Sequence, residues 1–359
     1  MERGTQLRLL AAEEVEVRPR FPSTRYQGSK AKLIAWIIEQ LSTLSFDRCL
    51  DAFGGTGVVA YHLKLAGKEV TYNDILRFNY LFGLALVENA NVRLSAEEIE
   101  WLLQPHDEMS YPDFIERTFP GIYFTDAENR WLDRTLTNIR ALPNRYKQAL
   151  AFFALAQAAL AKRPYNLFHR RNLYLRQADV SRSFGNKATW DKPFPLLFRR
   201  FAEEANRAVF DNGRNNRAMN CDILEITGEY DLVYLDPPYI SRKGVGVDYR
   251  DFYHFLEGMT MYERWGEEID YTSRHLRLRR KPSPWHQPKR IQQVLGETID
   301  HFRHSILAIS YRSDGIPSPQ EIERLLRRHK ARVRIARYGR YRYVLSTNRR
   351  AEELLFIAE

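Results

Sequence analysis

The sequence predicts an α/β fold in which a sheet carries helices on both faces and is interrupted by a mainly helical insertion. Three observations support this prediction. A strand, a glycine-rich turn, a helix and a second strand follow one another between residues 48 and 74; residues 78–161 show helical spacing without strand alternation; and strand-like segments return after residue 218. A chain of 359 residues is long enough for one large domain with an insertion, or for two domains.

The first elements form a βαβ unit. "RCLDAF" (48–53) is a short apolar strand, "VVAYHLKLAG" (58–67) is an amphipathic helix closed by a glycine, and "KEVTYND" (68–74) alternates as a second strand. The helical stretch that follows includes "YKQALAFFALAQAALA" (146–161), which is strongly apolar. Residues 162–192 are basic, aromatic and irregular, and a helix is expected from there to about residue 210.

The α/β pattern then resumes. We expect strands near 218–221 and 231–235, a basic loop at 271–290, a helix, a strand at 305–311 and a helix at 318–330. Two further strands are expected at "ARVRIARY" and "ELLFIA", close to the end of the sequence.

Positive charge is concentrated in three segments. The chain has 55 Lys and Arg against 45 Asp and Glu, a net charge of +10, and 25 of the cations lie in 162–192, 271–290 and 327–350. The last segment also interleaves Tyr338, Tyr341 and Tyr343, and aromatic rings among arginines suit base stacking and phosphate contact. One such segment alone is typical of a solvated face, but three together favour a nucleic-acid partner.

The cysteine and apolar patterns exclude several classes of protein. Cys49 and Cys221 lack the CxxC spacing of a zinc site and lie beside apolar runs, so we expect reduced core residues. Neither a 20-residue apolar segment nor the pattern of a signal peptide is present. We therefore expect a soluble, cytoplasmic protein without a membrane partner.

The segment "LDAFGGTGVVAYH" has the form of a ligand-binding turn. Gly54, Gly55 and Gly57 carry no Cβ, so the backbone can approach a ligand closely, and Asp74 ends the next strand, where an acid can bind ribose hydroxyls. Because Gly55-x-Gly57-x-x-Ala60 also fits the dinucleotide fingerprint, a nicotinamide-dependent oxidoreductase stays open. A Walker-type phosphate loop is disfavoured, since no Lys-Ser or Lys-Thr follows the glycines.

The segment "YDLVYLDPPYISRK" ends an apolar strand on Asp236-Pro237-Pro238-Tyr239. Two prolines fix the backbone there, so the Asp236 carboxylate and the Pro237 carbonyl can converge on one amine. The exocyclic amine of a nucleobase is a poor nucleophile, and two acceptors on its hydrogens would turn its lone pair toward an electrophile held by the glycine turn. Tyr239 would stack on the base, whereas hydride transfer has no use for this motif.

In these motifs the chain resembles the S-adenosylmethionine-dependent DNA adenine-N6 methyltransferases of the Dam-like, D12 class, which include the FokI-type modification enzymes. The resemblance rests on "RYQGSKAKL", "DAFGGTG", "YND", "CDIL" and "DPPY", in the order of that family. It implies a Rossmann-like methyltransferase sheet, with a catalytic domain formed by 1–77 and 205–359. It further implies an inserted helical target-recognition region at 78–204.

The resemblance also implies roles for individual residues. The catalytic set is Asp236, Pro237, Pro238 and Tyr239. The residues implied to bind S-adenosylmethionine are Tyr26, Lys30, Asp51, Phe53, Gly55, Gly57, Asp74, Asp222 and Asp236. The implied substrate is double-stranded DNA, with the target adenine flipped out of the helix and no metal required. A monomer that serves restriction-modification or defence is expected, and a cognate restriction endonuclease stays open as a further partner.

Other functions compete with this prediction. The same fold could methylate cytosine N4 or RNA adenosine, although in the resembling cytosine group Ser usually replaces the first Asp of the motif. A non-catalytic DNA-binding subunit and the oxidoreductase belong to other classes. The basic segment 271–290 has no counterpart in the resemblance, and its charge predicts a flexible arm that follows the DNA phosphates.

Overall fold

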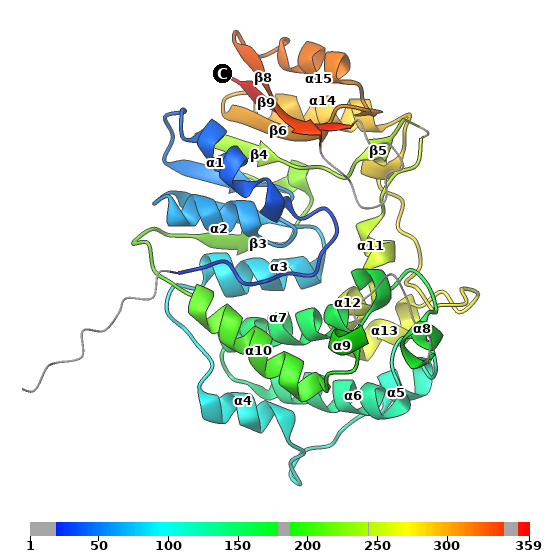
Figure 1. The fold of residues 1–359 in the computed structure, drawn as a ribbon. Coiled ribbons are helices and arrows are strands. Elements are labelled where there is room, and N and C mark those ends of the chain that lie inside the picture. The colour runs from blue at the N-terminus through cyan, green and yellow to red at the C-terminus, as the bar shows by residue number, and fades with distance from the viewer. Residues whose placement is uncertain (1–18, 179–186, 243, 341–350) are drawn as a thin grey trace, which may run out of the picture.

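A seven-stranded sheet organises the molecule. The computed structural model describes residues 19–178, 187–242, 244–340 and 351–359, and the strand order is β3-β2-β1-β4-β6-β9-β8 (Figure 1). The first five strands in that order run parallel, and β9 pairs antiparallel with both β6 and β8. The strands are β1 (Arg48–Asp51), β2 (Glu69–Asn73), β3 (Arg217–Met219), β4 (Leu232–Leu235), β6 (Ile306–Arg312), β8 (Val333–Arg340) and β9 (Glu352–Ala358). The predicted α/β fold with a Rossmann-like sheet is confirmed.

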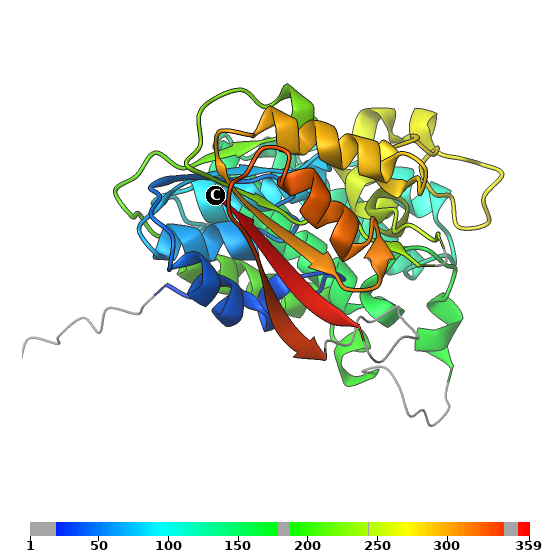
Figure 2. The same ribbon diagram turned by 90° about the horizontal axis from the view of Figure 1, so that it is seen from above.

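Both faces of the sheet are buried because neighbouring residues along each strand pack on opposite sides. In β1, Cys49 contacts the cluster that includes helices α1 (Ile34–Leu41) and α2 (Val58–Leu65). The next residue, Leu50, joins the cluster that includes α14 (Ile291–His301) and α15 (Pro319–Leu326). Figure 2 shows these two helix pairs on opposite sides of the sheet.

A helical layer lies below the sheet in Figure 1. Its helices are α3 (Arg77–Gly83), α4 (Ala96–Leu103), α5 (Phe114–Thr118), α6 (Asp126–Ala141), α7 (Arg145–Ala161), α8 (Leu173–Gln177), α9 (Lys187–Trp190), α10 (Phe194–Ala208), α11 (Tyr249–Phe252), α12 (His254–Met259) and α13 (Trp265–Glu268). Helix α7 is buried along its length from Ala149 to Ala161, which agrees with the apolar helix predicted at 146–161. Two short strands, β5 (Ile240–Ser241) and β7 (Gly315–Ile316), pair outside the main sheet.

One hydrophobic cluster joins this helical layer to the sheet part. It runs from Tyr61 of α2 through α7 and α10 to Trp265 of α13, and it ends at Leu278. Residues 253–278, which the sequence assigned with 205–359, therefore pack in the same cluster as residues 78–204. The domain boundaries at 77/78 and 204/205 stay predictions.

The basic segment 271–290 is held against the protein at several points, so the expectation of a wholly free arm is wrong. Leu278 is 2% exposed and forms an antiparallel bridge with Ile269. Arg277 pairs with Asp270 at 3.3 Å, and Trp285 is 7% exposed. The apolar side chains of Leu278 and Trp285 explain the difference, because removing apolar surface from water is favourable.

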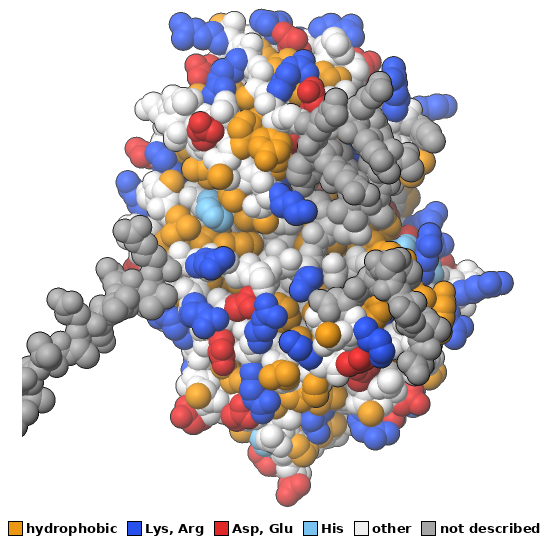
Figure 3. All heavy atoms as spheres, in the orientation of Figure 1, with side chains coloured by type: hydrophobic (Ala, Val, Ile, Leu, Met, Phe, Trp, Pro, Cys, Tyr) orange, Lys and Arg blue, Asp and Glu red, His pale blue; other side chains and the backbone are white. Residues whose placement is uncertain are grey.

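Charged side chains cover much of the described surface. Figure 3 shows Lys and Arg spread over both the sheet part and the helical part of one face, interspersed with acidic side chains. Residues 179–186 and 341–350 of the predicted basic segments lie outside the described residues, and the second range includes the interleaved Tyr341 and Tyr343. Among the helices of the described ranges, none combines the length and the apolar character needed to cross a lipid bilayer.

Candidate active site

A cavity of about 470 Å³ lies at the carboxyl ends of the parallel strands. In the sheet, β2 and β3 lie on one side of β1, whereas β4 and β6 lie on the other side. This reversal of strand order separates the loops that follow β1 and β4, and ligands of open α/β sheets bind at such a point. The loop after β1 is the predicted glycine turn, and the residue after β4 is Asp236.

The glycine turn owes its shape to backbone geometry. Gly55 and Gly57 have φ values of +52° and +79°, which residues with a Cβ rarely adopt. Gly54 serves packing instead, because a Cβ there would lie 2.0 Å from the ring of Tyr72. The turn is tied to the end of β2, since the Gly55 N–H donates to Asp74 Oδ2 at 2.9 Å.

Two buried carboxyl groups face this cavity. Burial raises the pKa of Asp74 to about 6, although its oxygens accept hydrogen bonds from the N–H groups of Gly55 and Leu76 and from Asn79. Burial also raises the pKa of Asp51 to about 8. Asp51 Oδ2 accepts from the Ala60 N–H at 3.1 Å, while its Oδ1 has no hydrogen-bond partner among the described residues.

A buried polar network surrounds Asp236. The Lys30 ammonium donates to Asp236 Oδ1 and to the Tyr239 hydroxyl, both at 2.7 Å, and lies 3.5 Å from Glu353 Oε1. The Tyr239 hydroxyl also lies 2.8 Å from Asp236 Oδ1 and from Glu353 Oε1, and Ser310 Oγ donates to the same Glu353 oxygen. The network thus links the motif after β4 to the first 3-10 turn (Lys30–Lys32) and to strand β9.

Charge pairing sets the protonation of this network. Burial alone would lower the pKa of Lys30, but the carboxylates of Asp236 and Glu353 raise it above its ordinary value of 10.5. Burial raises the pKa of Asp236, and Lys30 opposes that rise. Lys30 therefore carries its positive charge at neutral pH and orients the Asp236 carboxylate through Oδ1.

The structure brings most of the predicted site residues together. The predicted residues that line the cavity are Tyr26, Lys30, Asp51, Phe53, Gly55, Asp74, Asp222, Asp236 and Pro238. Gly57, Pro237 and Tyr239 lie outside the lining. The Tyr239 ring packs edge-on against Tyr311 at 5.1 Å, and its hydroxyl belongs to the network.

Several lining residues were not singled out from the sequence. Tyr249 lines the cavity, and its ring lies parallel to that of Tyr26 with 5.7 Å between centroids, while Tyr26 also stacks on Tyr253 at 4.6 Å. Glu257 accepts hydrogen bonds from the Arg77 and Phe78 N–H groups at the start of α3. The "DYRDFY" run (248–253) gave no sequence signal for the tyrosine stack, because stacking depends on the fold that brings residues 26 and 249–253 together.

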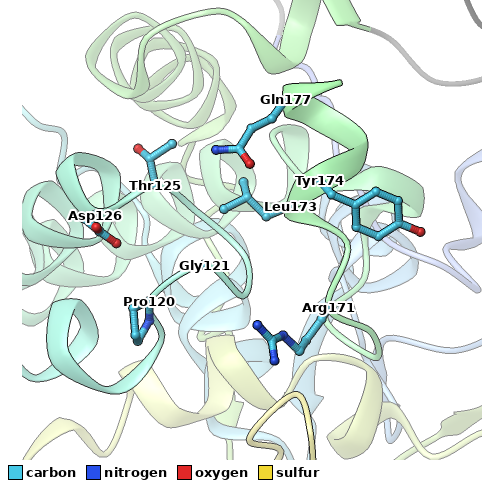
Figure 4. Close-up of a pocket in the computed structure, with 8 residues that line it drawn as sticks. All are labelled: Pro120, Gly121, Thr125, Asp126, Arg171, Leu173, Tyr174 and Gln177. Carbon is cyan, nitrogen blue, oxygen red and sulfur yellow. The ribbon is translucent and has the colours of Figure 1, made fainter. Parts of the chain in front are cut away.

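A second hollow, of about 740 Å³, lies in the helical layer beside the start of α6. Figure 4 shows its lining, with Arg171 and Gln177 extending toward the turn that precedes α6 and Tyr174 pointing away. None of the predicted site residues lines it. The chemistry of the motifs therefore belongs to the cavity at the sheet edge.

The residues of the sheet-edge cavity fit S-adenosylmethionine. This molecule carries a positive sulfonium, an ammonium group, ribose hydroxyls and an adenine amine, so it presents many hydrogen-bond donors and positive charge. The cavity offers the carboxyl groups of Asp51, Asp74 and Asp222, and Asp51 Oδ1 has no hydrogen-bond partner within the described part of the chain. A buried acceptor without a partner is costly, and a donor group of a ligand would satisfy it.

The fold and this site define a Rossmann-like methyltransferase. Residues 26–295 match the family model of the D12 class N6 adenine-specific DNA methyltransferases. The match covers most of the chain, and the chain belongs to this family. The oxidoreductase alternative is thereby removed.

Curated relatives agree with the family. The type II methyltransferase M2.HphI of Haemophilus parahaemolyticus is 30% identical over 350 residues, which covers 95% of this chain and 98% of the relative. M.NlaIII of Neisseria lactamica is 24% identical over 90% of this chain and 91% of its own length. M.FokI of Planomicrobium okeanokoites is 26% identical over 85% of this chain, which spans only 47% of that relative.

Proposed function

We propose that this chain transfers the methyl group of S-adenosylmethionine to N6 of an adenine flipped out of double-stranded DNA. The observation that carries the proposal is the arrangement around Asp236. Lys30 and Tyr239 both contact Oδ1, and the carboxyl group lines the same cavity as Gly55 and Asp74. An oriented acceptor thus shares one cavity with the glycine turn.

When bound, S-adenosylmethionine would supply a methyl group on a positively charged sulfur. The adenine amine nitrogen would bond to the methyl carbon in line as the carbon–sulfur bond breaks, and S-adenosylhomocysteine would leave. Asp236 Oδ2 accepts a hydrogen bond from the adenine amine, and the Pro237 carbonyl accepts the other. These two acceptors favour a pyramidal nitrogen whose lone pair points at the methyl group. The methylated amine is strongly acidic and loses its proton, so a strong base is not needed.

Lys30 acts through Asp236 rather than on the substrate. Its ammonium favours the ionised carboxylate, which is the better acceptor, and it binds Oδ1, so we assign Oδ2 to the substrate amine. Tyr239 supports the same oxygen through its hydroxyl. In this role the ring of Tyr239 does not stack on the base, and the cavity-lining Tyr249 is the better stacking surface.

The biological setting is proposed with the support of the family and its relatives. We propose that the enzyme acts in the cytoplasm as a monomer, protects DNA in a restriction-modification or defence system, and has a cognate restriction endonuclease. The helical region 78–204 would carry target recognition. Basic side chains on its surface would contact phosphates, which add affinity without sequence information.

The test is methylation of genomic DNA with labelled S-adenosylmethionine, followed by mapping of modified bases at single-base resolution. We expect N6-methyladenine at one short sequence. Asp236→Ala should bind S-adenosylhomocysteine nearly as the wild type does but lose on the order of a hundredfold or more in rate, the loss seen when one oriented hydrogen-bonding group is removed.

A matched control is Asp231→Ala at the other end of β4. Asp231 also accepts hydrogen bonds, from the Asp47 and Arg48 N–H groups, but it does not line the cavity. This variant should keep most of the methylation rate. Near-normal turnover in Asp236→Ala would contradict the catalytic role of Asp236. Modified cytosine in the map would contradict adenine as the target base.

A further inference from the structure

The segment Lys281–His286 forms a wall of the sheet-edge cavity that none of the sequence motifs includes. All six residues line the cavity. Pro282 and Pro284 fix the backbone, and Ser283 Oγ accepts from the Trp285 N–H at 3.3 Å, which starts the 3-10 turn Pro284–His286. These restraints limit the conformations of the segment before any ligand binds, which lowers the conformational entropy lost on binding.

The wall is attached to the glycine turn. The Trp285 ring meets the Phe53 ring edge-on, with 4.9 Å between centroids, and Phe53 directly precedes Gly54. The indole is 7% exposed and belongs to the cluster on the α14 face of the sheet. Phe53 itself lines the cavity, so Trp285 supports a ring that faces the ligand.

The wall is also attached to the loop that follows the Asp-Pro-Pro-Tyr motif. Gly246 forms a bridge with Ile240, the first residue of β5, and contacts the backbone of His286. A Cβ at Gly246 would lie 2.9 Å from the His286 carbonyl oxygen, which is too close for any side chain. The segment is thus clamped between the loops after β1 and β4.

We propose that Lys281–His286 is part of the donor site, and that Trp285 holds both this wall and Phe53 against S-adenosylmethionine. The inference rests on the proposed function. It divides the basic segment 271–290 into two parts with different partners. Residues 281–286 face the donor, whereas the exposed Arg279 and Arg280 remain outside the cavity lining and available to DNA.

The test is calorimetric binding of S-adenosylhomocysteine in the absence of DNA. Trp285→Ala should weaken binding about tenfold, because an aromatic contact and the support of Phe53 are lost together. Trp285→Phe keeps a ring and should stay within about twofold of the wild type. The matched control is Trp131→Ala, since Trp131 packs on Phe194 with the same 4.9 Å centroid distance but does not line the cavity.

Two further measurements do not depend on the folding of Trp285→Ala. Binding of S-adenosylhomocysteine should change tryptophan fluorescence in the wild type, and Trp285→Phe should abolish most of that change. Gly246→Ala should weaken binding although residue 246 does not line the cavity, because the added Cβ displaces the His286 backbone.

The outcomes separate this inference from the proposed function. If the wild type does not bind S-adenosylhomocysteine, the proposed function itself fails. If the wild type binds and Trp285→Ala and Gly246→Ala bind equally well, only the donor wall is overturned. Loss of DNA affinity in Trp285→Ala with unchanged S-adenosylhomocysteine affinity would also overturn it, because the wall would then belong to the DNA site.

Discussion

Replacing Lys30 with methionine should strongly destabilise the protein. The change removes an ammonium that lies 2.7 Å from Asp236 and 3.5 Å from Glu353 and keeps a side chain of similar length. The three side chains are 6%, 17% and 0% exposed, so water cannot replace the lost charge. Removing one partner of a buried ion pair costs about 3–5 kcal/mol, a large share of the roughly 5–15 kcal/mol that stabilises a typical domain.

The pH dependence of this cost follows from the pKa of Lys30. That pKa is raised above its ordinary value of 10.5, so the stabilisation is fully present below pH 10.5 and is lost only as the pH rises through the folded-state value. The free-energy penalty of Lys30→Met should therefore not shrink between pH 7 and pH 9.

The assay is urea unfolding, with Lys32→Met as the matched control. Lys32 lies in the same 3-10 turn but is exposed, so its replacement should change the free energy of unfolding by less than about 0.5 kcal/mol. Adding Glu353→Gln to Lys30→Met should recover part of the loss, because one buried carboxylate is then neutral. The reasoning is refuted if Lys30→Met is as mild as Lys32→Met, or if the effects of Lys30→Met and Glu353→Gln simply add.

Three more changes test other parts of the structure. Gly55→Val should weaken S-adenosylhomocysteine binding in calorimetry, whereas Gly67→Val, which also has a positive φ but no atoms within 4 Å of its Cβ, should lower stability without changing affinity. The free energy of unfolding of Asp51→Asn, relative to that of the ligand-free wild type, should be higher at pH 8 than at pH 5 by up to about 4 kcal/mol, because burial raises the pKa of Asp51 from 3.8 to about 8 and the wild type therefore loses stability as the pH rises between those values. An equal difference at both pH values in urea unfolding would contradict the buried-acid interpretation. Arg279→Ala combined with Arg280→Ala should weaken binding to cognate and unrelated duplexes alike and reduce the slope of log affinity against log salt by about 1.8, as expected for two phosphate contacts; titrations on two duplexes at several salt concentrations check this, and an unchanged slope would rule the contacts out.

The sequence predicted the elements that carry local signals. The strand at 48–53, the glycine-closed helix at 58–67 and the apolar strand at 231–235 correspond to β1, α2 and β4, because alternation, helical period and turn residues are properties of short windows. The glycine turn and Asp236 were predicted for the same reason. Both end a strand, and in a parallel sheet strand ends come together at one edge.

Features that depend on long-range packing could not be predicted in this way. Glu353 reaches Lys30 only because β9 inserts antiparallel between β6 and β8, a register that no local pattern specifies. Its sequence signal was slight: an acid beside the apolar run of β9, at a position that turns out to be fully buried. The contact between Trp285 and Phe53 was not predicted, because the positive charge of the surrounding segment favoured a DNA contact.

The hydrophobic cluster shared by the sheet part and the helical layer limits how such an enzyme can be re-engineered. Cuts at 77/78 and 204/205 would divide a hydrophobic cluster that includes Phe78, Ala205 and Trp265. A recognition region moved into another protein would therefore lose part of its hydrophobic core. Apolar surface left open in this way promotes aggregation. A successful chimera would have to carry residues 249–278 along with the insertion, or vary only the exposed side chains on its surface.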